Sequence, residues 1–394
     1  MKISKQIIFF TSLGMCLHAL GQTTLNASIG VEGLVDDQFD LTSEGSDVQS
    51  VTYRPNVRLT YEGRRYESEL SALYAATQFV GDDAMFSDFG ILNAGWDQSY
   101  EGQRSDFGLS INFRESLAAN TLELNDNALT QENDIVRSFR FNPTASWSTG
   151  PRTNLDLAYS YQRSRTESDD GTDELRADND FHRLSFGWRK DVSQRSALTL
   201  TGRFLAFRPR ETEFTGQTQV DADVFSGSVG GNFFLSERWS MAGSVGLEQL
   251  NRDSGDLGPG ESVEDGDIVF FADWAIERTG QHTDVGFGLS AGTVQQIDGG
   301  VDEQQSINFT LESGLSRSLT LDIDLQHLIA QQRSRGLTEF DAILRWQFAN
   351  NWRSSLAYQF RNQEADESLF LDSLDGQSNR VFLRLTYVFN DLRF

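Results

Sequence analysis

The chain has 394 residues, a formal net charge of −25 and a mean hydropathy of −0.43. A chain this acidic is poorly suited to nucleic acid, and no stretch after residue 21 approaches the roughly 18 to 20 apolar residues of a membrane helix. The low hydropathy does not exclude a membrane-spanning β-barrel, because only alternate residues of its strands face lipid.

Residues 1–21 have the features of a secretory signal peptide. Lys2 and Lys5 form a positive start, residues 7–20 form an apolar core, and Ala19-Leu20-Gly21 is a small-x-small cleavage site. Cleavage would remove Cys16, the only cysteine, so the mature chain is expected to hold no disulfide. Residues 22–394 show no linker or change of composition and are predicted to form one domain.

From Leu25 onward, apolar residues recur with a period of two, as they do in strands that separate two environments. On the last such segment, Val381, Leu383, Leu385 and Tyr387 share one face. About 18 segments of this kind are predicted, at 25–31, 51–61, 66–74, 92–100, 107–113, 139–147, 155–161, 184–188, 198–204, 225–235, 239–247, 268–276, 285–289, 307–315, 319–325, 340–348, 352–360 and 379–389.

The connections alternate between short turns and long polar segments. The short ones lie at 62–65, 101–104, 149–153, 190–195, 236–238, 278–282, 316–318 and 349–351, and the longer ones include 36–50, 115–134, 164–180, 251–265 and 361–378. This alternation predicts an all-β, transmembrane, antiparallel up-and-down barrel with short periplasmic turns and long acidic extracellular loops, in the outer membrane of a Gram-negative bacterium. A soluble secreted all-β protein or a solenoid is the alternative. Little chain precedes the first strand, so neither a plug nor a segment for energised import is expected.

The tryptophans follow the same pattern. Every tryptophan belongs to the apolar series and lies within a few residues of a short turn, which predicts an aromatic girdle at the periplasmic interface. The girdle residues are Trp96, Trp147, Trp188, Trp239, Trp274, Trp346 and Trp352.

Residues of the opposite parity should face the lumen, and their charges segregate. The expected acidic wall comprises Glu248, Asp267, Asp273, Glu277, Asp284, Glu312, Asp322 and Asp324. The expected basic wall comprises Arg54, Arg58, Arg345, Arg353, Arg361, Arg380 and Arg384, and a sparser arginine arc comprises Arg114, Arg140, Arg183, Arg189 and Arg203. Two readings remain open: a transverse field across a water-filled lumen, or ion pairs that brace the wall.

One strand departs from this polarity. Val269 and Phe271 are apolar on the inward parity of the segment 268–276, which suggests that a bulge shifts its alternation.

The sequence holds no catalytic, cofactor-binding or metal motif. The histidines after the leader are His182 and His327, in the outward series, and His282, in a turn. The acidic run 169–173 lacks the full ligand pattern of a calcium loop. No cofactor is therefore expected, and an enzyme is the least favoured class.

Short motifs carry a family resemblance. Tyr53-Arg54-Pro55, Tyr61-Glu62-Gly63-Arg64-Arg65 and the strand 70–74 form a strand, Gly-Arg turn, strand unit that recurs in Asn142-Pro143, Thr149-Gly150-Pro151-Arg152 and the strand 155–161. The chain thereby resembles the porin-like outer-membrane barrels associated with exopolysaccharide and PEP-CTERM (exosortase) gene clusters. That resemblance implies an envelope barrel linked to polysaccharide export, without catalytic residues.

These patterns predict a passive channel or export conduit for polar solutes, with polysaccharide as one candidate. The expected partners are outer-membrane lipid and lipopolysaccharide, the barrel assembly machinery, and the solute or polysaccharide itself, with no nucleic acid. The competing class is a non-conducting barrel whose loops carry a structural or surface-interaction role.

Overall fold

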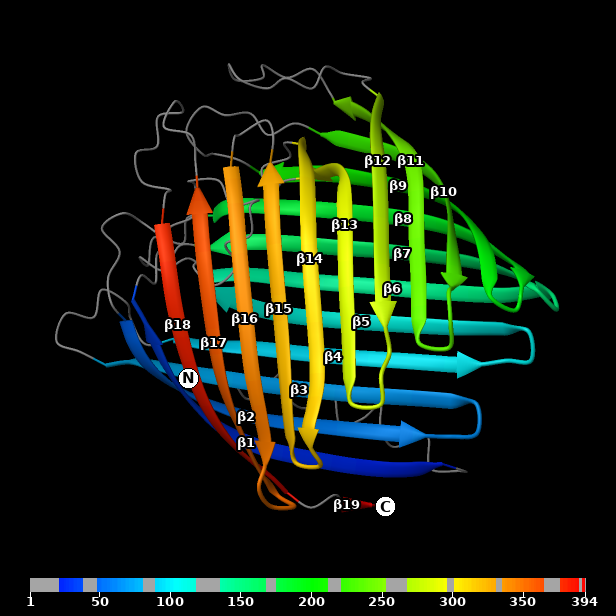
Figure 1. The fold of residues 1–394 in the computed structure, drawn as a ribbon. Helices are drawn as coiled ribbons and strands as arrows, with labels where there is room; N and C mark the ends of the chain where they lie inside the picture. The colour runs from blue at the N-terminus through cyan, green and yellow to red at the C-terminus, as the bar shows by residue number, and fades with distance from the viewer. Residues whose placement is uncertain are drawn as a thin grey trace.

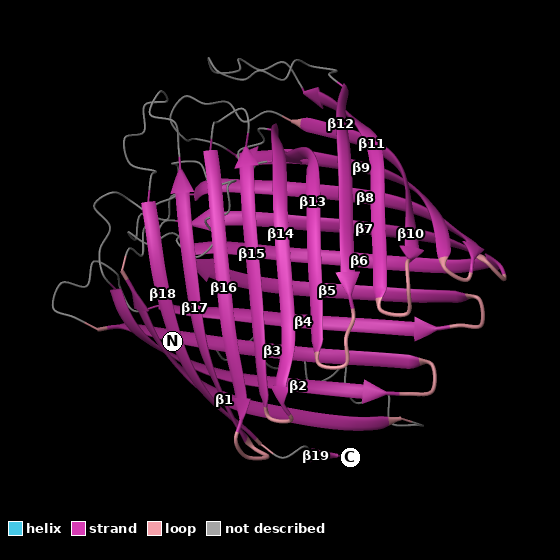
Figure 2. Ribbon diagram, viewed as in Figure 1, coloured by secondary structure: helices cyan, strands magenta, loops and turns pink. Residues whose placement is uncertain are grey.

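The computed structural model describes residues 21–37, 48–80, 89–117, 135–167, 175–211, 221–252, 268–295, 301–330, 335–364, 376–389 and 392–393. These residues form one antiparallel β-sheet that closes on itself (Figure 1). Over the same ranges only strands and their connections are drawn (Figure 2), and no helix is long and apolar enough to cross a membrane. The predicted leader lies outside the described residues except for Gly21.

The strands are long, between 11 and 19 residues apart from the short last one. The first nine are β1 (Gln22–Asp36), β2 (Val48–Glu62), β3 (Tyr66–Phe79), β4 (Phe89–Glu101), β5 (Ser105–Leu117), β6 (Ile135–Gly150), β7 (Thr153–Glu167), β8 (Leu175–Ser193) and β9 (Ser196–Glu211). The others are β10 (Ala222–Phe234), β11 (Trp239–Arg252), β12 (Ile268–Arg278), β13 (Thr283–Gln295), β14 (Val301–Ser316), β15 (Leu319–Ala330), β16 (Arg335–Gln347), β17 (Trp352–Glu364), β18 (Gly376–Val388) and β19 (Leu392–Arg393).

Each strand pairs with its neighbours in the sequence, and β1 closes the ring against β18. The closing pairs run from Ser28 opposite Val388 to Asp36 opposite Arg380. The two residues of β19 continue this edge by pairing with Thr24 and Leu25 of β1, so they do not add a strand to the ring. The predicted closed barrel of about 18 strands is confirmed.

The two ends of the barrel differ in their connections. At one end, called the turn end, two to four residues join successive strands; the opposite end is called the loop end. Several strands extend into stretches that the sequence assigns to loops. For example, β8 begins at Leu175, inside the predicted loop 164–180. Most of the predicted acidic loops lie outside the described residues. Two loop-end connections, 296–300 and 331–334, are short.

Side chains alternate between the outer and inner faces as the sequence predicts. Ile29, Val31 and Val35 of β1 are exposed on the outside, whereas Glu32 and Asp36 of the same strand are buried on the inside. The predicted bulge at Val269 and Phe271 is wrong: β12 keeps an unbroken register with β11 from Ile268 to Arg278. These two apolar side chains therefore do face inward.

Candidate functional site: the inner wall of the barrel

The inner wall is enclosed at the loop end and open at the turn end. Inward side chains near the loop end are buried on many strands, among them Asp36, Thr52, Thr77, Ser116, Glu248, Ser378 and Arg380. Near the turn end, inward side chains such as Glu277, Asp284, Glu312 and Arg353 are exposed. The lumen therefore offers more accessible polar surface at the turn end.

The closing seam between β1 and β18 holds the most buried ion pair described. Arg380 Nε lies 2.5 Å from Asp36 Oδ2, and the side chains are 4% and 0% exposed. Ser378 Oγ donates a 2.7 Å hydrogen bond to Asp36 Oδ1. Nearer the turn end, Glu32 accepts from two arginines, Arg54 on β2 at 2.6 Å and Arg384 on β18. The seam is thus tied from inside by charge-assisted hydrogen bonds.

Most of the expected basic wall is paired within the wall. Besides Arg54, Arg380 and Arg384, three more of its arginines contact a carboxylate on an adjacent strand. These pairs are Arg58 with Glu69 at 3.1 Å, Arg361 with Glu339 at 2.9 Å, and Arg345 with Asp322. Arg353, at the turn end, has no recorded ion pair among the described residues. The bracing reading therefore describes six of these seven arginines.

The sparser arginine arc is different. Arg114 on β5, Arg140 on β6 and Arg183 on β8 are exposed on the inner face, and none is ion-paired within the described part of the chain. Arg140 instead donates two hydrogen bonds, of 2.6 and 3.1 Å, to Gln162 Oε1. The remaining two members are paired, Arg189 with Asp191 at 3.1 Å and Arg203 with Glu248.

The expected acidic wall is only partly neutralised. Five carboxylates, from Glu277, Asp284, Glu312, Asp322 and Asp324, line one inward cavity of about 510 Å³, together with Asp341 and Arg345. Arg345 contacts Asp322, and over the described residues the other four carry no recorded ion pair. Glu248 is paired with Arg203, and Asp267 lies outside the described residues.

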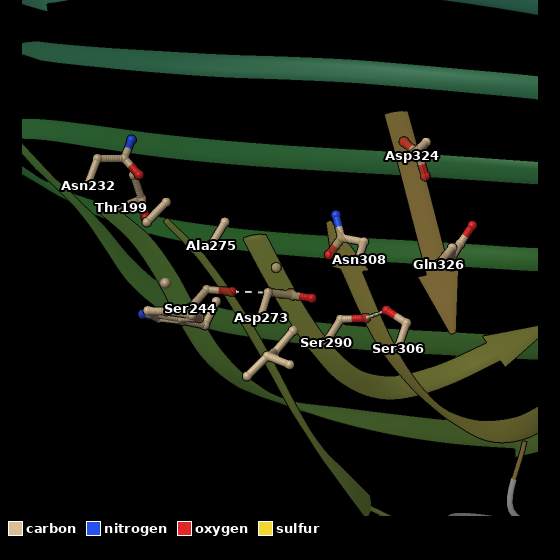
Figure 3. A pocket seen from close by; sticks show the side chains of 15 residues that line it. Thr199, Asn232, Ser244, Asp273, Ala275, Ser290, Ser306, Asn308, Asp324 and Gln326 are labelled. Atoms are coloured by element: carbon tan, nitrogen blue, oxygen red, sulfur yellow. Dashed lines mark hydrogen bonds between the residues drawn. The ribbon is translucent and has the colours of Figure 1, made fainter. Parts of the chain in front are cut away.

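A second inward cavity, of about 540 Å³, lies over β9 to β15 and has a polar side (Figure 3). Ser244 Oγ lies 3.4 Å from Asp273 Oδ2, and Ser290 Oγ lies 2.5 Å from Ser306 Oγ. Asn308, Asp324 and Gln326 complete its polar side. Hydroxyl, amide and carboxylate groups on this wall can exchange hydrogen bonds with a hydrated solute.

Neutralising the acidic cavity is expected to change ion flow in a salt-dependent way. The variant Asp284→Asn/Glu312→Asn/Asp324→Asn should lower single-channel conductance about twofold in 0.1 M salt and leave it nearly unchanged in 1 M salt, where the screening length falls from about 10 to 3 Å. The matched control, Asp322→Asn/Arg345→Gln, removes a charge pair without changing net charge and should conduct normally. An equal effect at both salt concentrations would contradict a local electrostatic role.

All seven tryptophans lie in the outward series, in the turn-end half of their strands. Five of them, Trp147, Trp239, Trp274, Trp346 and Trp352, are exposed. Ring contacts link Trp346, Phe348, Trp352, Tyr387 and Phe389 across β16 to β18, with centroids between 5.0 and 6.3 Å apart. The arrangement is typical of residues at the boundary between lipid and water.

The histidines of the strands have structural partners on the outer face. His182 Nδ1 lies 2.9 Å from the Tyr159 hydroxyl, and His327 Nδ1 lies 2.9 Å from the Thr338 hydroxyl. Among the residues that the structure describes, no group of three or more histidine, cysteine, aspartate or glutamate side chains could hold a metal ion.

Sequence reasoning missed three important acids: Glu32, Asp36 and Asp341. Glu32 and Asp36 have the inward parity of β1, and a ring that closes on β18 puts them beside Arg384 and Arg380. That signal was present in the sequence but needed the register of the closing strands. The inward position of Asp341 follows directly from the alternation of residues along β16.

The fold and inner wall together define a closed antiparallel barrel with an apolar outside and a polar, charged inside. No protein-family model matches the chain, and no curated protein matches it. Solved structures of similar architecture include the outer membrane protein OpdK of Pseudomonas aeruginosa, at 10% identity and a TM-score of 0.48, with 94% of this chain and 99% of that chain covered. OccK2 (OpdF) of the same species in complex with glucuronate is 11% identical, with a TM-score of 0.49 and coverages of 93% and 97%. OccAB4 of Acinetobacter baumannii is 10% identical, with a TM-score of 0.49 and coverages of 94% and 99%.

Proposed function

We propose that this chain is an outer-membrane channel, a passive pore for small polar solutes. The observation that carries the proposal is that the ion pairs of the inner face run along the wall and do not cross the lumen. Every inner pair recorded among the described residues lies within one strand or joins strands that are adjacent or two apart, as in Arg189 with Asp191, Arg361 with Glu339 and Arg203 with Glu248. Such pairs brace the wall without crossing the lumen, and an 18-stranded ring is wide enough to enclose an aqueous path.

The outer face supports the membrane placement. Exposed apolar residues cover the strands between the tryptophans and the loop end, as in Val245, Leu247, Leu383 and Leu385. A water-soluble barrel has no reason to expose a continuous apolar band, whereas lipid requires one. The girdle then marks the periplasmic boundary, and the signal peptide proposed at residues 1–21 would direct export.

The arrangement of charges on the inner wall indicates which kind of solute the pore would orient. Arg114 on β5 and Arg140 on β6 are nine strands round the ring from Glu312 on β14 and Asp324 on β15, so the exposed arginine arc and the acidic cavity lie on opposing walls. A transverse field of this kind aligns polar and dipolar solutes. Because the loop end is enclosed, the arrangement favours small solutes over a polymer such as polysaccharide.

Single-channel recording of the refolded chain in a planar bilayer tests this proposal. We expect steady conductance of porin magnitude. A barrel that shows heat-modifiable migration in gels, and so is folded, but stays electrically silent would overturn the pore and favour a structural or surface-interaction barrel.

A further inference from the structure

One seam of the barrel is incompletely paired. Strands β12 and β13 pair only from Ala272 opposite Ala291 to Arg278 opposite Val285, at the turn end of both strands. Nevertheless β12 remains paired with β11 out to Ile268, and β13 remains paired with β14 out to Gln295. In Figure 1 the upper end of β13 turns toward β14 while β12 continues upward beside β11. The wall therefore separates at its loop end between these two strands.

Contacts at two glycines locate the point at which β12 and β13 begin to separate. A Cβ atom built on Gly292 of β13 would lie 3.0 Å from Cβ of Phe271, so the strands are still close at that level. A Cβ atom built on Gly246 of β11 would lie 2.5 Å from two ring atoms of Phe271, so the ring lies over this glycine on the inner wall. The opening thus begins just beyond Phe271.

The opening falls within the depth expected for hydrocarbon. Phe270 is four residues from Trp274 of the girdle, or about 13 Å along the strand, whereas the apolar band of such barrels is about 25 Å tall. Unpaired backbone at that depth is unfavourable in contact with lipid and is tolerated where it lines a polar or water-filled path. We therefore expect the unpaired edge of β12 to have the aqueous lumen on one side and lipid on the other.

On the β12 side of the opening, the side chains are apolar on both faces of the strand. Ile268 and Phe270 point outward and are 67% and 60% exposed, among the most exposed large apolar side chains of the barrel. Val269 and Phe271 point inward, where most strands carry polar groups. One step toward the turn end, Asp273 and Ser290 begin the polar cavity of about 540 Å³. An unpaired strand end with apolar side chains, next to an acidic, hydroxyl-lined cavity, matches a molecule with an apolar tail and a cationic head.

We propose that the loop ends of β12 and β13 form a lateral portal, through which small amphipathic cations pass between the lumen and the hydrocarbon of the outer leaflet. The portal rests on the membrane placement proposed above, but it is a separate route from axial flow of polar solutes. On its β12 side lie Val269, Ile268 and Phe270, with Phe271 at its lower edge, where the strands are still close. Asp273 receives the cationic head.

Nitroxide labels on single cysteines test whether the wall is open to lipid. Collision with oxygen, which concentrates in hydrocarbon, is compared with collision with a water-soluble nickel chelate. The label at Phe271→Cys should give an oxygen-to-nickel ratio within about twofold of the outward control Leu289→Cys, as expected for contact with acyl chains. The inward control is Ser306→Cys on β14, which is paired on both sides and should report water. A Phe271 label that behaves like the Ser306 label overturns the portal.

Block of the ion current tests the solute class, with octyltrimethylammonium compared with tetramethylammonium. The octyl compound should block at a concentration about tenfold lower, because its chain can bury apolar surface at the portal. Phe271→Ser and Asp273→Asn should each abolish most of that difference, whereas the outward change Phe287→Ser should not. Equal block by both cations in the unaltered chain contradicts the portal's preference. Conductance of each variant is recorded in parallel, so loss of the pore itself is distinguished from loss of the portal.

Discussion

Replacing Asp36 with alanine is expected to lower the free energy of unfolding by about 3–5 kcal/mol, because the change leaves the Arg380 guanidinium buried without its carboxylate. The pair also joins the first and last full strands, so its loss weakens the seam that closes the ring. Urea unfolding in lipid vesicles, followed by tryptophan fluorescence and by heat-modifiable migration, measures the effect.

The exposed inner pair of Arg58 and Glu69 provides the control. Its side chains are 52% and 29% exposed, so Glu69→Ala should cost less than about 1 kcal/mol. The double variant Asp36→Leu/Arg380→Met, which removes both buried charges, should recover much of the lost stability. A single Asp36→Ala change no more costly than Glu69→Ala would show that the seam does not depend on this pair.

Ion selectivity is expected to depend on the three exposed members of the arginine arc. The variant Arg114→Gln/Arg140→Gln/Arg183→Gln should raise the cation-to-anion permeability ratio about threefold or more, since charged side chains that line a pore set its selectivity. The reversal potential in a salt gradient measures this ratio. These three arginines lack an ion-pair partner within the described ranges, so their charge is offered to the lumen.

A charge-neutral double variant, Arg58→Gln/Glu69→Gln, is the matched control and should leave the reversal potential unchanged. Neutralising Arg380 or Arg384 of the expected basic wall should shift selectivity less, because Asp36 and Glu32 already compensate them. Equal shifts from the arc and from Arg384 would contradict this division of roles.

The barrel itself was predictable because its physical cause is local. Alternation such as Val381, Leu383 and Leu385 against Arg380 and Arg384 needs only the two-residue period of a strand and a difference in solvent between its faces. Turn lengths then fix the up-and-down order. Inward placement of the charged residues follows from the same period.

Pairing among those charges was not predictable in the same way. Whether Arg384 faces a carboxylate depends on the register of β18 against β1, and one residue of slippage would place it against another side chain. The seam between β12 and β13 is a similar case. Nothing in the alternation of 268–276 indicates where its pairing with β13 ends, and the inward Phe271 suggested a bulge that is absent.

The seam between β1 and β18 also has a consequence for the order of folding. Other neighbouring strands are joined by turns or loops and can form as hairpins, whereas Glu32 and Arg384 are separated by 352 positions. Closing a segment of that length costs about 4 kcal/mol more than closing a four-residue turn on a logarithmic loop-entropy scale. The last edge should therefore form late, once the other strands hold the two ends near each other. Once formed, the buried ion pair of Asp36 and Arg380 should slow the separation of β1 from β18, and hence the unfolding of the completed ring.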